Sequence, residues 1–173
     1  MGITKDEMME AGVRAARDSM RNKGEIRIQV VGFSPEHGMV AMDLNDAWGY
    51  GDEAKDAALA QVRVLFQTHG VEAFIVTSEA WVTRHTLPKG STAKDAVRKA
   101  EELTKAGHRA SQSAERKEVV MIGAGDGDGI TWKNFDIKRD AKGKVTDLVE
   151  MREACVTMAR FDMLCVPTKS KTH

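Results

Sequence analysis

The sequence predicts an α+β fold: a single domain with a largely antiparallel sheet and about three helices packed mainly on one face of it. Long segments with the 3.6-residue apolar period of amphipathic helices are separated by shorter segments with the two-residue alternation of strands. Turn-forming residues join most neighbouring strands directly, which makes those strands antiparallel. Helices do not follow every strand in turn, so a doubly wound parallel sheet is not expected.

Residues 71–85, VEAFIVTSEAWVTRH, form the strand around which the chain is organised. Residues 73–76 are a continuous apolar run, which is typical of a strand covered on both faces. The alternation of a strand places Ile75, Glu79 and Trp81 on the same face. Glu79 is thus a carboxylate flanked by apolar residues in mid-strand, and charged residues are rarely buried.

Helix signals occur at three further places along the chain. Thr4 and Glu7 have the spacing of a capping box, and the apolar residues that follow predict a helix over residues 5–22. An apolar stripe predicts a second helix over residues 53–68. A third helix starts at a Ser-Thr pair and ends at Gly107. It is weakly apolar and highly charged, which predicts a position on the surface.

The remaining segments are expected to form the rest of the sheet. Strands are predicted at residues 26–30, 39–44, 118–122, 130–138 and 145–151, with turns at 33–38, 123–129 and 140–144. Residues 152–158 suit either a helix or a strand, whereas cleaner alternation favours a strand over residues 158–166. The domain is therefore expected to span residues 1–166, and the polar residues 167–173 to form a tail.

Composition narrows the classes of function. The 173 residues fit one domain, and the 26 basic residues balance the 26 acidic ones, which argues against a strongly basic nucleic-acid binder and leaves a local patch open. Two cysteines, Cys155 and Cys165, are too few for a disulfide framework, so a reducing cytoplasm is expected. The sequence contains no apolar segment of about 18 residues, so no membrane association is expected.

The most motif-like segment is GAGDGDG at residues 123–129. Asp128 occupies the place of the third glycine of a dinucleotide fingerprint, and no helix is expected after it. As an EF-hand loop the segment has Ala124 at the first ligand position and Phe135 where a glutamate should stand. A hairpin turn is therefore predicted. The sequence also has no Walker A motif, no GxSxG motif and no metal-binding histidine spacing, so neither a cofactor nor a metal is expected.

Glu79 has a chemical and a structural interpretation. It is the one candidate for a catalytic acid or base, or for a metal ligand, provided that other carboxylates converge on it. Alternatively it forms a buried ion pair with a basic residue near the adjacent strand, which the sequence favours because buried charges are seldom unpaired. The candidate partners are Asp43, Asp46 and Asp126 for chemistry, and Arg116 or Lys117 for an ion pair.

One hairpin carries basic residues interleaved with aromatic ones, a pattern that can bind single-stranded nucleic acid. Asp136 and Asp140 interrupt this pattern, which favours an ordinary hairpin whose lysines protect an edge strand. The candidate binding residues on it are Trp132, Lys133, Lys138, Arg139, Lys142 and Lys144.

Three short motifs carry a resemblance: FIVTSEAW at residues 74–81, RKEVV at residues 116–120, and the Asp-Gly pair at residues 128–129. Together they resemble a pattern in small uncharacterised bacterial and phage proteins, in which a SEAW-type strand precedes an RREV-type strand and a DG turn. Lys117 stands where that pattern has a second arginine. The resemblance implies a small cytoplasmic α+β protein from a bacterium or phage. It carries no activity, so no catalytic residue is transferred.

These observations together predict a non-enzymatic protein that binds a macromolecular partner, either another protein or a second copy of itself. The expected contact surface is the hairpin over residues 130–144, because an edge strand offers unpaired amides and carbonyls. Two alternatives stay open. One is an enzyme or small-molecule binder built on Glu79, and the other is a nucleic-acid binder that uses the basic hairpin.

Overall fold

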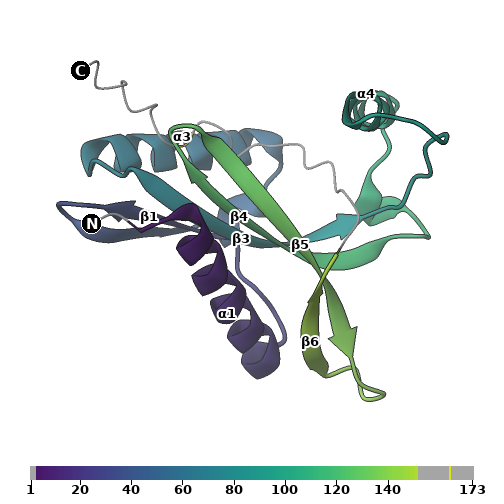
Figure 1. Cartoon of the computed structure of the whole chain (residues 1–173), viewed down its shortest axis with the longest axis horizontal. Coiled ribbons are helices and arrows are strands. Elements are labelled where there is room, and N and C mark those ends of the chain that lie inside the picture. Colours follow the sequence, from purple (N-terminus) through teal and green to yellow (C-terminus); the bar gives the residue numbers. More distant parts are fainter. Residues whose placement is uncertain (1–2, 152–163, 165–173) are drawn as a thin grey trace.

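The computed structural model describes residues 3–151 and Leu164 (Figure 1). These residues form one six-stranded sheet in the order β2-β1-β3-β4-β5-β6, and every neighbouring pair is antiparallel. The α+β class and the antiparallel sheet are therefore confirmed. The helices are α1 (Lys5–Lys23), α2 (Asn45–Trp48), α3 (Asp52–Thr68), α4 (Ala93–Lys105) and the short 3₁₀ helix η1 (Ala110–Gln112). The strands are β1 (Gln29–Ser34), β2 (Gly38–Asp43), β3 (Ala73–Val82), β4 (Lys117–Asp126), β5 (Gly129–Arg139) and β6 (Val145–Glu150).

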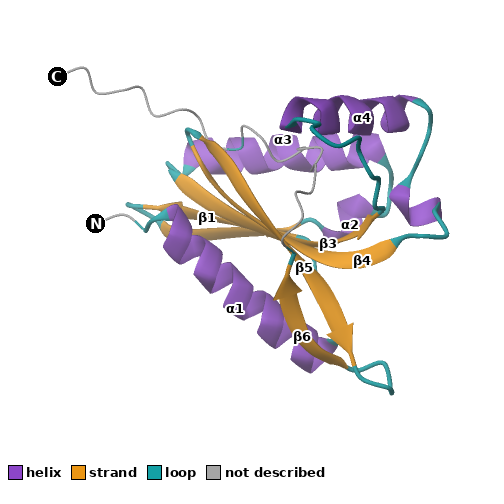
Figure 2. Cartoon of the chain, turned by 45° about the vertical axis from the view of Figure 1, so that its right-hand side comes forward, coloured by secondary structure: helices purple, strands orange, loops and turns teal. Residues whose placement is uncertain are grey.

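The two long packed helices lie on opposite faces of the sheet, as Figure 2 shows. Ile75 of β3 belongs to the cluster under α1, whereas its neighbours Phe74 and Val76 belong to the cluster under α3. The expectation that the helices pack mainly on one face is wrong. The apolar run of β3 already required cover on both faces, and α1 and α3 each supply one side of it.

Helix α1 closely follows its sequence signals. Thr4 Oγ1 accepts a hydrogen bond from the Glu7 amide at 3.2 Å, and a Glu7 carboxylate oxygen accepts one from the Thr4 amide at 2.8 Å. The helix ends at Gly24, whose φ of 76° is left-handed. A Cβ atom at Gly12 would overlap the Ile75 side chain, so the absence of a side chain there lets α1 approach the sheet closely.

The GAGDGDG segment is mostly strand and not turn. β4 continues to Asp126, and only the two residues after it form the turn to β5. Gly123 and Gly125 lack side chains where aromatic rings from neighbouring strands cross β4: a Cβ at Gly123 would lie 2.8 Å from the Trp132 ring, and one at Gly125 would overlap the Phe74 ring. These glycines therefore serve close packing, whereas only the last one, Gly129, needs a positive φ, of 130°.

The segment after β6 is described only at Leu164, which is 1% exposed and belongs to the cluster under α3. The strand predicted over residues 158–166 and the polar tail at residues 167–173 otherwise lie outside the described residues. Within the described residues, no helix is long and apolar enough to cross a membrane.

Candidate functional site

Glu79 lies on the face of β3 that α1 covers, and it does not form the predicted ion pair. Its Oε1 atom accepts a hydrogen bond from the backbone amide of Ile26 at 2.5 Å, just beyond the end of α1. Lys117 Nζ lies 2.6 Å from Asp136 Oδ1 instead, and the Arg116 guanidinium lies 5.1 Å from the centre of the Trp81 ring. The ion-pair prediction is wrong because Glu79 pairs in register with Val120, three residues from Lys117, which places Lys117 on the opposite face.

The pKa of Glu79 is raised above its ordinary value. Burial is the largest cause, and the neighbouring carboxylates of Glu118 and Glu25 add to it, while the hydrogen bond from Ile26 opposes it. Arg139 donates to Glu118 at 3.0 Å, so the basic residue at this site neutralises Glu118 and not Glu79. Of these two carboxyl groups, that of Glu79 is therefore the one whose charged form is disfavoured by burial.

The carboxylates expected to join Glu79 in chemistry lie elsewhere. Asp126 stands opposite Ala73 at the far end of β3, where Lys5 Nζ contacts it at 2.8 Å. Asp43 lies on β2, beyond β1, and pairs with Arg27 at 3.2 Å. Asp46 lies in α2. Among the described residues, no group of three or more His, Cys, Asp and Glu side chains could hold a metal ion.

The basic hairpin does not form one continuous surface. Trp132 and Lys133 are consecutive in β5 and so lie on opposite faces; Trp132 packs with the cluster under α3. Several cations of the hairpin are matched by carboxylates: Lys133 by Glu150 at 3.2 Å, Lys138 by Asp136 at 3.6 Å, and Arg139 by Glu118 at 3.0 Å. The exposed Lys142 and Lys144 stand at the turn after β5.

The expected edge strand of this hairpin is inside the sheet. β5 pairs with β4 on one side and with β6 on the other, so β2 and β6 are the edges of the described sheet. β6 is protected as an edge. A register shift interrupts its pairing at Lys138 and Arg139, and Arg17 of α1 donates to the Leu148 carbonyl at 3.2 Å. Arg17 also lies 3.6 Å from the Asp147 carboxylate.

The other edge, β2, has none of these protections in the described structure. Residues 38–42, GMVAM, carry no charge, and the pairing with β1 runs without a register shift. Met39 is 74% exposed. Met39 and Ala41 extend the apolar row of Phe33 and Val31, their partners on β1. An exposed, uncharged and regular edge of this kind is a template for strand addition.

A second feature of the molecule is a cleft of about 620 Å³ between α4, the segment that follows β3, and the segment that leads into β4. α4 buries none of its residues, which confirms its predicted surface position (Figure 1). The residues that α4 contributes to the cleft include Ala96, Lys99, Ala100 and Leu103. Sequence reasoning did not identify this cleft, because its walls come from segments that meet only in the folded chain.

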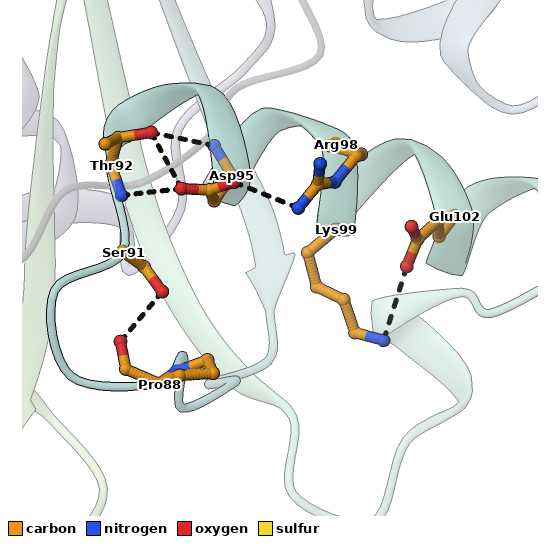
Figure 3. A network of polar contacts seen from close by, with 7 residues as sticks. All are labelled: Pro88, Ser91, Thr92, Asp95, Arg98, Lys99 and Glu102. Carbon is orange, nitrogen blue, oxygen red and sulfur yellow. Dashed lines mark hydrogen bonds and ion pairs between the residues drawn. The ribbon is translucent and has the colours of Figure 1, made fainter.

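α4 is stabilised by local contacts and not by core packing (Figure 3). Asp95 accepts hydrogen bonds from the Thr92 amide at 2.9 Å and the Thr92 hydroxyl at 2.8 Å, and the Thr92 hydroxyl accepts from the Asp95 amide at 3.3 Å. Arg98 donates to Asp95 at 2.9 Å, and Lys99 lies 3.6 Å from Glu102. The capping box and these pairs stabilise the helix from within its own segment.

Comparisons with known proteins identify no relative of this chain. No family model, no curated protein and no solved structure matches the chain.

Proposed function

We propose that the protein acts by binding another polypeptide and not by catalysis, and that the surface for this binding is the β2 edge. The single observation that supports it is the contrast between the two edges of the sheet. β6 is interrupted by a register shift and contacted by Arg17, whereas residues 38–42 of β2 carry no charge and pair regularly with β1. Proteins generally protect such edges, so an unprotected one indicates a strand that is covered by a partner.

The partner that best fits β2 is a second copy of the same strand. A two-fold axis perpendicular to the sheet keeps each face continuous, so only residues of the same face stand opposite each other. A register centred on Val40 then places Met39 opposite Ala41, and Gly38 opposite Met42. It also places His37 of one copy opposite Asp43 of the other, which puts no like charges together. In the dimer, Met39 of each copy would thereby lie beside Ala41 of the other copy, so both exposed apolar residues would be covered in both copies.

The test is the oligomeric state measured by light scattering coupled to gel filtration. We expect a dimer at roughly 100 μM protein, where an association with a micromolar Kd is nearly complete. Ala41→Lys should give a monomer that melts like the wild type at a concentration too low for dimers, because an exposed substitution costs within about 0.5 kcal/mol of stability while a lysine blocks edge pairing. At roughly 100 μM the wild type should melt higher, because dimerisation stabilises it by mass action. Val149→Lys, at an exposed position of β6, is the control and should remain a dimer.

A cross-link tests the register. In a Cys155→Ser, Cys165→Ser background, Val40→Cys should form an intermolecular disulfide on oxidation, because a residue on the two-fold axis faces itself. Met42→Cys faces Gly38 and should cross-link far less. A wild-type monomer at this concentration, or a dimer that Ala41→Lys leaves intact, would overturn the proposal.

The other functions have weaker support. The proposed basic hairpin pairs most of its cations with carboxylates, and the aspartates proposed to assist Glu79 lie apart from it. We further propose a reducing cytoplasm, which the low cysteine count supports, and a bacterial or phage origin, which only the short sequence motifs support.

A further inference from the structure

The cleft beside α4 has the size of a ligand site. Its volume of about 620 Å³ lies within the usual range of roughly 300–1,000 Å³ for pockets that hold small molecules. Ala96, Ala100 and Leu103 form an apolar wall along α4, and Leu87 adds to it from the segment after β3. A molecule with an apolar or aromatic body would therefore find a matching surface along this wall.

The charged residues that line the cleft are mostly basic. The cleft is lined by four cationic side chains and one carboxylate, that of Glu115. The cations are Arg84, Lys99, Arg109 and Lys117.

Three of these cations already have partners: Lys117 lies 2.6 Å from Asp136, Lys99 lies 3.6 Å from Glu102, and Arg84 also has a partner. The side chain of Arg109, by contrast, has no ion pair or hydrogen bond with any residue that the structure describes. A guanidinium group presents several donors in a fork that matches a carboxylate or a phosphate. Arg109 is therefore the cation best placed to receive an anionic ligand.

The helix that forms one wall of the cleft is unusual in this molecule. Apolar and charged residues are separated more sharply around α4 than around α1 or α3, yet those two helices bury residues and α4 buries none. Its capping box and short-range ion pairs keep it folded without that packing. The apolar stripe of α4 is thus left available to a ligand in the cleft.

We propose that this cleft binds a small organic anion, with a carboxylate or phosphate held by Arg109 and an apolar or aromatic body against the apolar wall of α4. The mostly basic lining suits the anionic group, and the volume fits a molecule of about nucleoside size. This site shares no residue with the β2 edge, so each proposal can hold or fail without the other.

The probe for the test is 8-anilinonaphthalene-1-sulfonate, an aromatic anion whose fluorescence rises in an apolar site. We expect saturable binding to the wild-type protein. Arg109→Glu should weaken it by at least about tenfold, because the ligand loses a charge-assisted contact and meets a like charge. Lys142→Glu, at the exposed turn after β5, makes the same change of charge and should bind as the wild type does. Ala100→Trp leaves every charge in place but fills the cleft, and should also abolish binding.

Displacement of the probe distinguishes the sources of the anion. Displacement by decanoate indicates a carboxylate ligand with an aliphatic body, and displacement by adenosine monophosphate indicates a phosphate ligand with an aromatic body. The proposal is overturned if Arg109→Glu and Ala100→Trp both melt like the wild type and both bind the probe as tightly as the wild type does. It is also overturned if the wild type does not bind the probe, if inorganic phosphate displaces it as well as the organic anions do, or if a single-stranded oligonucleotide competes better than the nucleotide.

Discussion

Glu79 shows how much one hydrogen bond determines the role of a charged residue. The sequence identified it correctly as an unusual carboxylate inside a strand, but it could not supply the partner. That partner is the backbone amide of Ile26, which any residue could provide and which no side-chain pattern reveals. The neighbouring Glu118 is acidic, and its own cation is Arg139, 21 residues further along the chain.

The raised pKa of Glu79 predicts a defined pH dependence. A carboxyl group whose pKa rises on folding contributes stability that is present below its ordinary pKa, near 4.5, and is lost as the pH rises through the raised value. Glu79→Gln keeps an oxygen for the Ile26 amide and removes the charge. It should therefore melt above the wild type at pH 7, and the difference should shrink as the pH falls towards 4.5.

Glu79→Ala separates the hydrogen bond from the charge. It leaves the amide of Ile26 without its acceptor, which costs about 1–3 kcal/mol relative to Glu79→Gln at every pH, because neither variant carries the titrating carboxyl group. Thermal melts of the three proteins between pH 4.5 and 8 make the comparison. If Glu79→Gln is destabilised at pH 7 as much as Glu79→Ala, the negative charge of Glu79 stabilises the fold, and the predicted direction of the pH dependence is wrong.

At the scale of elements, local signals predicted positions well and lengths less well. The capping residues placed the start of α1, because a cap is read from neighbouring residues. β4 was predicted to end at residue 122 and extends to Asp126, since its glycines resemble a turn in sequence. Only the rings of Phe74 and Trp132, which arrive from neighbouring strands, explain why glycine is required inside the strand.

The two capping boxes of the chain allow a matched experiment. Thr4→Ala and Thr92→Ala each remove a hydroxyl cap, a change that costs about 1 kcal/mol of helix stability. α1 buries Met8, Met9, Ala16 and Met20, so its loss is felt by the whole domain, whereas α4 buries nothing. Thr4→Ala should lower the melting temperature by roughly 2–4 °C. Thr92→Ala should leave it unchanged.

Hydrogen exchange supplies the complementary measurement. In Thr92→Ala the amides of α4 should exchange several-fold faster than in the wild type, while those of β3 and β4 keep their protection, because a helix without buried contacts opens locally. A drop in melting temperature for Thr92→Ala equal to that of Thr4→Ala would mean that α4 is part of the cooperative core.

At the scale of the molecule, the sequence predicted the class and the antiparallel sheet but not the faces on which the helices lie. Class follows from periodicities that each segment carries by itself. The side that a helix covers depends on how the chain crosses the sheet after a loop, and the same apolar stripe serves either side. The α4 cleft was unpredictable for the same reason, since Leu87, Lys99 and Arg109 line one cleft only in the folded chain.

The two apolar clusters on opposite faces of the sheet should unfold together. β3 joins them, because Ile75 packs under α1 while Phe74 and Val76 pack under α3. Met20→Ala and Leu59→Ala remove one buried side chain from each cluster, 1% and 2% exposed, and each should cost about 2–5 kcal/mol.

Two probes reveal whether the faces are coupled. Two of the three tryptophans, Trp48 and Trp132, pack against the α3-side cluster, so tryptophan fluorescence reports mainly on that face, while circular dichroism reports on all helices. Coupling through β3 predicts that Met20→Ala, on the α1 side, lowers the transition seen by fluorescence as much as the one seen by circular dichroism. If Met20→Ala shifts only the circular dichroism transition, the faces unfold independently and β3 does not transmit stability between them.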